Sequence, residues 1–244
     1  MKVKFFAPSY KRPSKSDTQK NYPFVRLVVR ESEAEQYKKN GNDILTVPDE
    51  VQGNVCRVKN YILKNLFDAD CLVLMDDDCK GIYRWENQKK IKYGSEELME
   101  FCEASTRLCT EWGFSLWGLN CVTDKGAYRE HTPFSTLKFI GGPFQAHLNN
   151  KMLYDESLPL KEDYDITLQH IVFNGGCLRF NFCAYDVKQA EQAGGCATYR
   201  NLDREKEQFE LLQRKWGKDI VQRDYQSRRS FDFNPIIKSP WAGI

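Results

Sequence analysis

The sequence predicts an α/β fold, an open, mostly parallel, twisted sheet with helices on both of its faces. Apolar segments of strand length alternate with segments of helical period through the first half of the chain. The segment 71–75, Cys-Leu-Val-Leu-Met, is apolar at every position, which is typical of a parallel strand buried on both faces. Such an alternation of strands and helices is typical of a parallel sheet.

The first half contains four predicted strands and two predicted helices. The strands cover residues 3–7, 24–29, 44–47 and 71–75, and the helices cover 31–39 and 53–67. The first strand ends at Pro8, and the polar, basic residues 9–21 are predicted to form a loop. The helix 53–67 carries its apolar residues on one stripe, as expected for a helix that covers a sheet.

The second half is more mixed. Strands are predicted over 114–119, 136–140, 143–148 and 178–185, and helices over 98–112, 163–173 and 203–221. Residues 189–200 contain two consecutive glycines and are predicted to form a flexible loop. Because no linker is evident, residues 1–244 are interpreted as one domain. Its nucleotide-binding half covers about 1–80, and its acceptor half covers 81–244 and ends in a helix and a tail.

Composition narrows the class of protein. The net charge is +2, from 36 basic and 34 acidic residues, so the charge balance does not demand a nucleic-acid partner. The segments 2–20 and 223–238 are nevertheless locally basic and suit phosphate binding. Neither a signal peptide nor an apolar stretch long enough to span a membrane is present, so we expect a cytoplasmic protein without a membrane partner.

The nine cysteines are scattered and form no C-x-x-C pair. This spacing argues against a structural zinc site and against a disulfide framework. Several of the cysteines lie inside apolar segments, so reduced, packed thiols are the better interpretation, and they suit a reducing compartment.

Three consecutive carboxylates, Asp76, Asp77 and Asp78, follow the predicted strand 71–75 directly. In open α/β sheets, ligands bind beyond the carboxyl ends of the strands. Strand alternation sends Asp76 and Asp78 to one side and Asp77 to the other. Together, Asp76 and Asp78 can hold a hard divalent cation and leave positions for phosphate oxygens. The alternative is a solvated acidic turn, and aspartates alone do not identify the phosphate chemistry.

A wider combination of motifs resembles the GT-A glycosyltransferases, whose sheet is of the Rossmann type. The first strand runs into Ala-Pro-Ser-Tyr-Lys-Arg at 7–12, Arg57 lies on the helix before the carboxylate strand, and Lys-Glu-Asp occurs at 161–163. Within this superfamily the chain most resembles the TET-associated, largely phage-encoded glycosyltransferases that are predicted to modify 5-hydroxymethylcytosine in DNA. The supporting segments are 7–13, 75–79, 161–167, 215–217 and 234–235.

This resemblance implies a reaction and a set of roles. Asp76 and Asp78 would hold Mn²⁺ or Mg²⁺ on the diphosphate of a nucleotide sugar, a UDP-sugar by family habit. The hexose would move to the hydroxyl of 5-hydroxymethylcytosine, in the host cytoplasm if a phage encodes the protein. The residues implied for binding the nucleotide sugar are Pro8, Ser9, Tyr10, Arg12, Arg57, Asp76, Asp77, Gly141, Gly142 and Arg200. Lys59 is a further candidate for the phosphates.

Asp163 is the preferred general base, with Glu162 and Asp165 as alternatives, and a base at this position would make the reaction inverting. An acid at a helix start also serves as a cap, so this alternative stays open. Many GT-A enzymes use a C-terminal histidine on the metal, whereas the three histidines here are His131, His147 and His170. The rival functions are a glycosyltransferase acting on a saccharide, lipid or protein, a nucleotidyltransferase, and a non-catalytic nucleic-acid-binding module.

Overall fold

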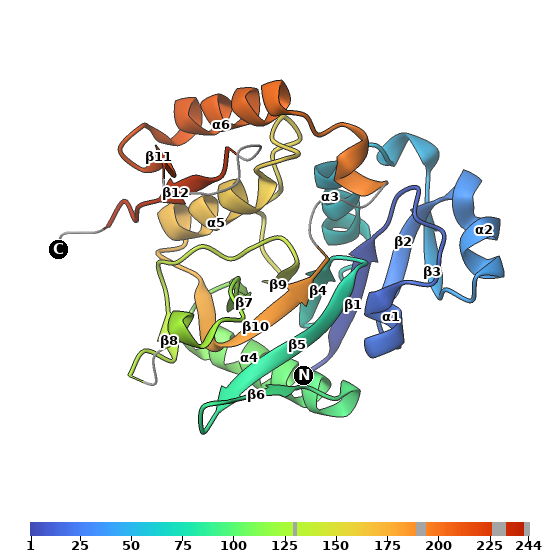
Figure 1. Ribbon diagram of the computed structural model, residues 1–244, viewed down its shortest axis with the longest axis horizontal. Helices are drawn as coiled ribbons and strands as arrows, with labels where there is room; N and C mark the ends of the chain where they lie inside the picture. Colours follow the sequence, from blue (N-terminus) through green and yellow to red (C-terminus); the bar gives the residue numbers. More distant parts are fainter. Residues whose placement is uncertain (129–130, 189–193, 226–232, 242–244) are drawn as a thin grey trace.

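The computed structural model describes residues 1–128, 131–188, 194–225 and 233–241. Ten strands form one sheet: β1 (Val3–Pro8), β2 (Arg26–Arg30), β3 (Ile44–Val47), β4 (Cys71–Met75), β5 (Cys79–Glu86), β6 (Lys89–Lys92), β7 (Leu116–Asn120), β8 (Phe134–Ser135), β9 (Phe144–Leu148) and β10 (Leu178–Val187). Their order is β3-β2-β1-β4-β9-β7-β10-β5-β6, and β8 pairs with β10 (Figure 1). A separate two-stranded sheet joins β11 (Val221–Arg223) to β12 (Pro235–Ile237).

Six α-helices lie among the described residues: α1 (Asp17–Asn21), α2 (Ala34–Lys39), α3 (Val55–Asn65), α4 (Ser95–Glu111), α5 (Glu162–Phe173) and α6 (Leu202–Trp216). Short 3₁₀ turns occur at Glu31–Glu33, Asp49–Val51, Lys125–Ala127 and Gly195–Thr198. None of the described helices is long and apolar enough to cross a membrane.

The sheet confirms the predicted α/β class. Strands β3, β2, β1 and β4 are parallel neighbours, as the alternation of the first half predicts. Strand β9 runs antiparallel to both β4 and β7, so the second half is mixed. Strands β1, β4, β7 and β10 nevertheless all run the same way, because β10 pairs with β7 in parallel. Their carboxyl ends therefore meet at one edge of the sheet.

Helices cover both faces, and side-chain alternation decides which residues meet them. On β4, the residues Cys71 and Val73 belong to the same core as Leu98 and Cys102 of α4. The intervening Leu72 and Leu74 pack with residues of α3 and with Ile166 of α5. Figure 1 shows α4 on one side of the sheet and α5 and α6 on the other. Strand β4, buried at every position, is thus the centre of both cores.

Two sequence predictions about elements are wrong, and one hairpin was not predicted. The hairpin β5–β6 was not predicted, because its turn uses Asn87 and Gln88 with positive φ and lacks the glycine that signals such turns. Residues 136–140 form no strand, since the Ile140 N–H bonds to Thr167 Oγ1 at 3.3 Å. The last helix ends at Trp216, because Gly217 adopts a φ of 93°, which interrupts the helix before residue 221.

Two further sequence predictions concern loops and thiols. The predicted loop 9–21 contains the short helix α1, which begins at the capping residue Ser16. Residues 189–193 of the predicted glycine-containing loop, and residues 226–232 of the basic tail, lie outside the described residues. All nine cysteines are free and seven are buried, which confirms the interpretation as packed thiols.

Two buried histidines predict acid sensitivity. His147 on β9 and His170 on α5 each keep one ring nitrogen without a hydrogen-bond partner among the described residues. Burial lowers the pKa of His170 to about 4 and the pKa of His147 well below its usual value. Both are therefore neutral in the native state, whereas the unfolded chain takes up protons near pH 6.5. The unfolded state binds more protons below that pH, so the free energy of unfolding falls as pH falls from 6.5 towards 4.

For His170 alone, the expected loss between pH 7 and pH 5 is about 2 kcal/mol. Urea unfolding of the wild type and of His170→Gln at both pH values measures it. The variant should lose less stability than the wild type over this interval. Equal losses in the two proteins would show that His170 does not carry the effect.

Candidate active site

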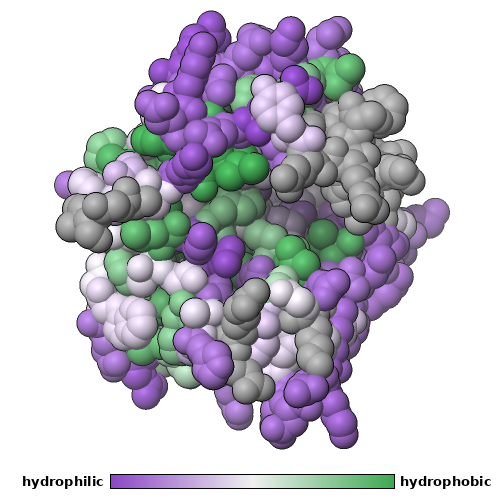
Figure 2. Space-filling model, turned by 60° about the vertical axis from the view of Figure 1, so that its left-hand side comes forward, coloured by the Kyte–Doolittle hydropathy of each residue, from purple (hydrophilic) through white to green (hydrophobic). Residues whose placement is uncertain are grey.

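A cavity of about 570 Å³ lies where the carboxyl ends of β1, β4, β7 and β10 meet. Each strand contributes residues from its end or from the loop that follows it, namely Ser9 from after β1, Asp76 from after β4, Cys121 from after β7 and Tyr185 from β10. The starts of α3 and α5 and the segment 195–200 complete the wall. Figure 2 shows a hollow of this kind, with hydrophobic and hydrophilic residues in its wall.

The three aspartates after β4 have different partners. Ser9 Oγ donates to Asp77 Oδ2, and Arg12 Nη1 donates to Asp77 Oδ1 at 3.0 Å. The same Arg12 nitrogen lies 3.4 Å from Asp78 Oδ2, whereas Asp78 Oδ1 is buried without a partner among the described residues. The Asp76 carboxylate accepts no hydrogen bond from the described part of the chain. Asp77 is thus neutralised, whereas the Asp76 carboxylate and Asp78 Oδ1 have no hydrogen-bond partner among the described residues.

Burial and mutual repulsion perturb the same two carboxylates. Burial first, and the neighbouring Asp78 second, raise the pKa of Asp76 to about 7. Burial and Asp77 raise the pKa of Asp78 to about 6. Mn²⁺ and Mg²⁺ prefer carboxylate oxygens as ligands. Asp76 and Asp78 provide two neighbouring carboxylates with oxygens that lack hydrogen-bond partners, so these residues fit a divalent cation.

A third protein ligand is missing from this constellation. No group of three or more His, Cys, Asp and Glu residues able to hold a metal occurs among the described residues. His147 and His170 are fully buried in the core, and neither lines the cavity. The remaining coordination positions would therefore fall to phosphate oxygens and water.

Two acids at the start of α5 face the same cavity. Glu162 Oε1 lies 3.1 Å from Nζ of Lys59, a lysine of α3 that is only 3% exposed. Asp163 Oδ2 accepts the Gly142 N–H at 3.0 Å, and Asp163 Oδ1 accepts the Tyr164 N–H at 2.9 Å. Burial and the Glu162 charge raise the pKa of Asp163 to about 6. Glu162 is thus neutralised by a lysine, whereas Asp163 is held in place by backbone groups that leave lone pairs free.

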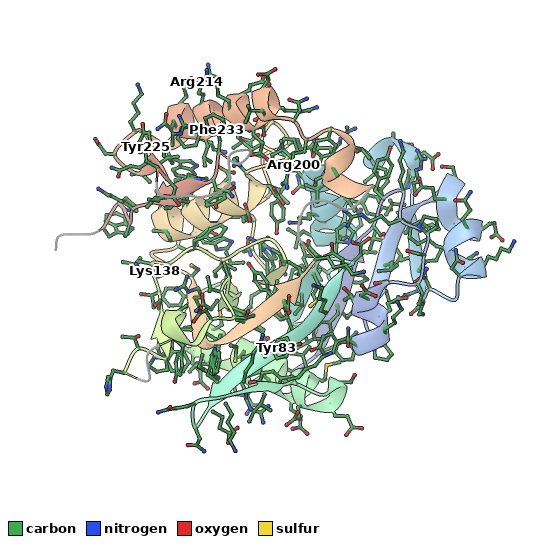
Figure 3. All side chains as sticks on the ribbon, in the orientation of Figure 1. Tyr83, Lys138, Arg200, Arg214, Tyr225 and Phe233 are labelled. Atoms are coloured by element: carbon green, nitrogen blue, oxygen red, sulfur yellow. The ribbon has the colours of Figure 1, made fainter. Side chains whose placement is uncertain are left out.

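A buried charge cluster joins this acidic pair to α6. Lys161 Nζ lies 2.5 Å from Glu205 Oε2, and both side chains are almost completely buried, at 1% and 2% exposure. The other oxygen of Glu205 lies 3.0 Å from Arg200 Nε. Glu205 therefore fixes Lys161, the residue before the acidic pair, and Arg200, which lines the cavity (Figure 3).

The segment after Gly194 lies over the loop that follows β1. The Gly195 N–H bonds to the Tyr10 carbonyl oxygen at 2.8 Å, and Arg12 Nη2 donates to the Gly194 carbonyl oxygen at 3.3 Å. The Tyr10 ring, which lines the cavity, has Arg30 at 5.2 Å and Lys11 at 5.1 Å from its centroid. One wall of the cavity is therefore built from two segments far apart in the sequence.

The structure brings most of the predicted site residues together. The predicted residues that line the cavity are Pro8, Ser9, Tyr10, Arg12, Asp76, Asp77, Asp78, Gly142, Glu162, Asp163 and Arg200. Three predicted residues are not among its lining. Arg57 is exposed and donates from Nη1 to the Glu50 carbonyl oxygen at 2.9 Å. Asp165 is bonded to Trp216, Lys215 and Gln169. Gly141 packs against the Tyr185 side chain.

Tyr185 is the cavity residue that sequence reasoning missed most clearly. Tyr185 lies two residues before the end of β10 and is 7% exposed. The charges of Asp163 and Asp76 act on its hydroxyl. A Cβ atom on Gly141 would lie 2.1 Å from that hydroxyl, so the glycine makes room for it. The rule that ligands bind at the carboxyl ends of strands was the available signal, because 178–185 was a predicted strand.

Comparison with known proteins supports the fold. No protein-family profile matches the sequence, and neither does any curated protein. Among solved structures, TarS of Staphylococcus aureus in complex with UDP-GlcNAc matches with a TM-score of 0.54 and 14% identity, over 87% of this chain and 65% of that chain. Glucosyl-3-phosphoglycerate synthase from Mycobacterium tuberculosis, in complex with Mn²⁺, UDP-glucose and phosphoglyceric acid, matches with a TM-score of 0.51 and 12% identity, over 98% of this chain and 89% of that chain.

These two neighbours are glycosyltransferases of the GT-A fold, and this chain shares that fold. At 65%, the chain spans less than two thirds of the TarS chain. At identities of 14% and 12%, the structural similarity shows the fold alone, so the reaction has to be argued from the residues of the site.

Asp76→Asn should stabilise the protein in the absence of divalent metal. The change removes a buried charge that Asp78 repels, so the free energy of unfolding at pH 8 should rise by roughly 2–4 kcal/mol. Mn²⁺ should stabilise the wild type and leave the variant unchanged. Thermal unfolding with and without Mn²⁺ measures both effects. Asp43→Asn, at an exposed pair with Arg26, is the matched control and should change stability by less than about 1 kcal/mol. A destabilised Asp76→Asn protein, or one still stabilised by Mn²⁺, would contradict this account.

Gly141→Ala should destabilise the protein by about 1–3 kcal/mol, because the added methyl group overlaps the Tyr185 hydroxyl. Tyr185→Phe removes that hydroxyl and should recover at least half of the loss in the double variant. Chemical unfolding of the wild type, both single variants and the double variant gives the coupling energy. Simple additivity of the two changes would show that the hydroxyl does not fill this space.

Proposed function

We propose that this protein is a divalent-metal-dependent glycosyltransferase that uses a nucleotide sugar, with UDP as its nucleotide. The observation that carries this proposal is that one cavity is lined by Asp76 and Asp78, whose carboxylates include unpartnered oxygens, and by a separate acid with a raised pKa, Asp163. The GT-A fold adds support, since the two neighbours were crystallised with UDP-GlcNAc and with UDP-glucose and Mn²⁺.

The cavity divides into parts with distinct roles. Residues of the first loop, Pro8 to Arg12, would hold the base and ribose, with the Tyr10 ring available for stacking on the base. Asp76 and Asp78 would hold Mn²⁺ or Mg²⁺, which neutralises negative charge on the diphosphate when bound. Arg200 and Lys59 would add charge-assisted bonds to phosphate oxygens. Residues 1–80 would thus form the nucleotide half and residues 81–244 the acceptor half of one domain.

Asp163 is the proposed general base. An acceptor hydroxyl oxygen attacks the anomeric carbon of the sugar, the bond from that carbon to the diphosphate oxygen breaks, and the hydroxyl proton passes to Asp163. The products are the glycosylated acceptor and the nucleoside diphosphate, with inversion at the anomeric carbon. A raised pKa suits Asp163 to accept a proton, whereas Glu162 is paired with Lys59 and Asp165 is held by three partners.

The proposed acceptor is the hydroxyl of 5-hydroxymethylcytosine in DNA. The support is the resemblance of several short motifs to the TET-associated glycosyltransferases, among them the segment 161–167. A saccharide or other small acceptor is the second candidate, and the mycobacterial neighbour, crystallised with phosphoglyceric acid, favours it.

The direct experiment measures release of nucleoside diphosphate from a panel of nucleotide sugars in the presence of Mn²⁺. Duplex DNA with and without 5-hydroxymethylcytosine serves as the acceptor. Release that requires both the metal and the hydroxymethyl group supports the whole proposal. Metal-dependent release that is indifferent to DNA discards the DNA acceptor, and release of pyrophosphate would indicate a nucleotidyltransferase.

Asp163→Asn should lower kcat by about 10²–10⁴, with little change in affinity for the nucleotide, because the base is lost and the shape is kept. In the wild type, kcat at saturating Mn²⁺ should fall about tenfold per unit as pH drops below about 6, since a protonated Asp163 cannot accept the proton. Asp165→Asn is the companion variant. Its kcat should fall only to the extent that the variant loses thermal stability and is partly unfolded. A larger loss of kcat in a fully folded Asp165→Asn protein would move the base to Asp165.

A further inference from the structure

The hairpin β5–β6 extends the cavity region along the edge of the sheet. Strand β5 begins at Cys79, directly after Asp78, and β6 ends the strand order of the described sheet. At a rise of about 3.3 Å per residue, the eight residues of β5 reach roughly 26 Å from the carboxylates. One strand of a duplex carries a phosphate about every 3.4 Å, so this distance corresponds to roughly eight nucleotides.

The hairpin is strongly basic. Residues 79–92 contain five basic residues, Lys80, Arg84, Lys89, Lys90 and Lys92, and one acidic residue, Glu86. The whole chain has a net charge of only +2, so this short segment concentrates positive charge. Lys80, Lys89, Lys90 and Lys92 are all exposed.

The face of the hairpin that points away from the core combines Lys90 and Lys92 with aromatic rings. Tyr83 is directly opposite Lys92, and Trp85 is directly opposite Lys90, so the four side chains share one face. Lys90 Nζ lies 4.1 Å from the centroid of the Tyr83 ring, and both rings are partly exposed. The neighbouring residue Ile82 faces the other way and is fully buried in the core. Tyr83 is labelled in Figure 3 on this hairpin.

Helix α1 links the hairpin to the mouth of the cavity. Lys92 Nζ bonds to Asn21 Oδ1 of α1 at 2.6 Å. The exposed Lys188 follows β10, lines the cavity and pairs with Asp17 of α1 at 2.5 Å. Lysines are thus present from the mouth of the cavity to the turn of the hairpin.

We propose that the outer face of the β5–β6 hairpin binds the DNA that flanks the target nucleotide. Lys80, Lys90 and Lys92 would contact backbone phosphates, and Tyr83 and Trp85 would pack against sugars or unstacked bases. The target nucleotide would leave the stack and enter the cavity beside Asp76 and Asp78. This inference rests on the proposed transfer to DNA and names the surface that selects such an acceptor.

Lysines on an edge strand also protect a sheet from pairing with another sheet. That explanation requires charge on β6 alone. Lys80 lies on β5 and Lys188 follows β10, and both are close to the carboxylate end of the sheet. Charge complementarity to a polyanion accounts for all of these positions together.

The test compares two double charge reversals of equal net charge. Lys80→Glu with Lys90→Glu changes the hairpin, and Lys38→Glu with Lys39→Glu changes α2, whose lysines are also exposed. Fluorescence anisotropy with a labelled duplex containing 5-hydroxymethylcytosine gives Kd over a range of salt concentrations. Thermal unfolding, and metal-dependent hydrolysis of the nucleotide sugar without DNA, confirm that each variant is folded and keeps its donor site.

The hairpin variant should raise Kd for DNA at least tenfold and reduce the slope of log K against log salt by about 2. The α2 variant should stay within about twofold of the wild type. Tyr83→Ala in the wild type should also weaken DNA binding, but the slope of log K against log salt should not change, because stacking releases no counterions. DNA binding lost in the hairpin variant without any sugar transfer in the wild type would overturn the proposed reaction and leave this surface standing.

Three outcomes would overturn the inference. The first is a Kd for the hairpin variant within twofold of the wild-type Kd. The second is equal weakening by both variants, which would assign the effect to net charge. The third is a hairpin that binds a polyanionic polysaccharide more tightly than DNA at the same salt concentration, which would assign the surface to a saccharide acceptor.

Discussion

The need to keep three consecutive carboxylates at the end of a fully buried strand governs this structure. Asp76, Asp77 and Asp78 follow β4, in which every residue is buried, so water alone does not screen them. Arg12 neutralises Asp77, and Ser9 donates a hydrogen bond to it. Asp76 and Asp78 have raised pKa values, and Asp78 Oδ1 has no hydrogen-bond partner among the described residues. Such an arrangement costs stability in the absence of a cation, and this cost is the physical basis of the divalent-metal site that we propose.

Charge pairs between different helices surround the carboxylates. Two further buried charges have partners from other elements: Glu162 of α5 pairs with Lys59 of α3, and Lys161 pairs with Glu205 of α6. Removing one partner of such a pair leaves an uncompensated buried charge and costs about 3–5 kcal/mol. These pairs therefore fix α3, α5 and α6 around the cavity. Asp163, held by two backbone N–H groups, receives its place from the same framework.

The sequence predicted the parallel half of the sheet and the position of the three aspartates at the end of β4, because both depend on local signals. Strand β4 is apolar throughout, and its three aspartates mark its end. The hairpin β5–β6 escaped prediction because its turn lacks glycine and its strands are polar. Glu205 is brought to the site by tertiary packing with Lys161 and Arg200, and no local pattern identifies such a partner. The surface proposed to bind DNA likewise forms only when β5 and β6 pair.

The most direct test of the central claim is the affinity of UDP measured by calorimetry with and without Mn²⁺. The account predicts that Mn²⁺ strengthens UDP binding at least tenfold in the wild type, and that this gain disappears in Asp78→Asn, since the cation joins the carboxylates to the diphosphate. The same UDP affinity with and without Mn²⁺ in the wild type, or an undiminished gain in Asp78→Asn, would contradict it.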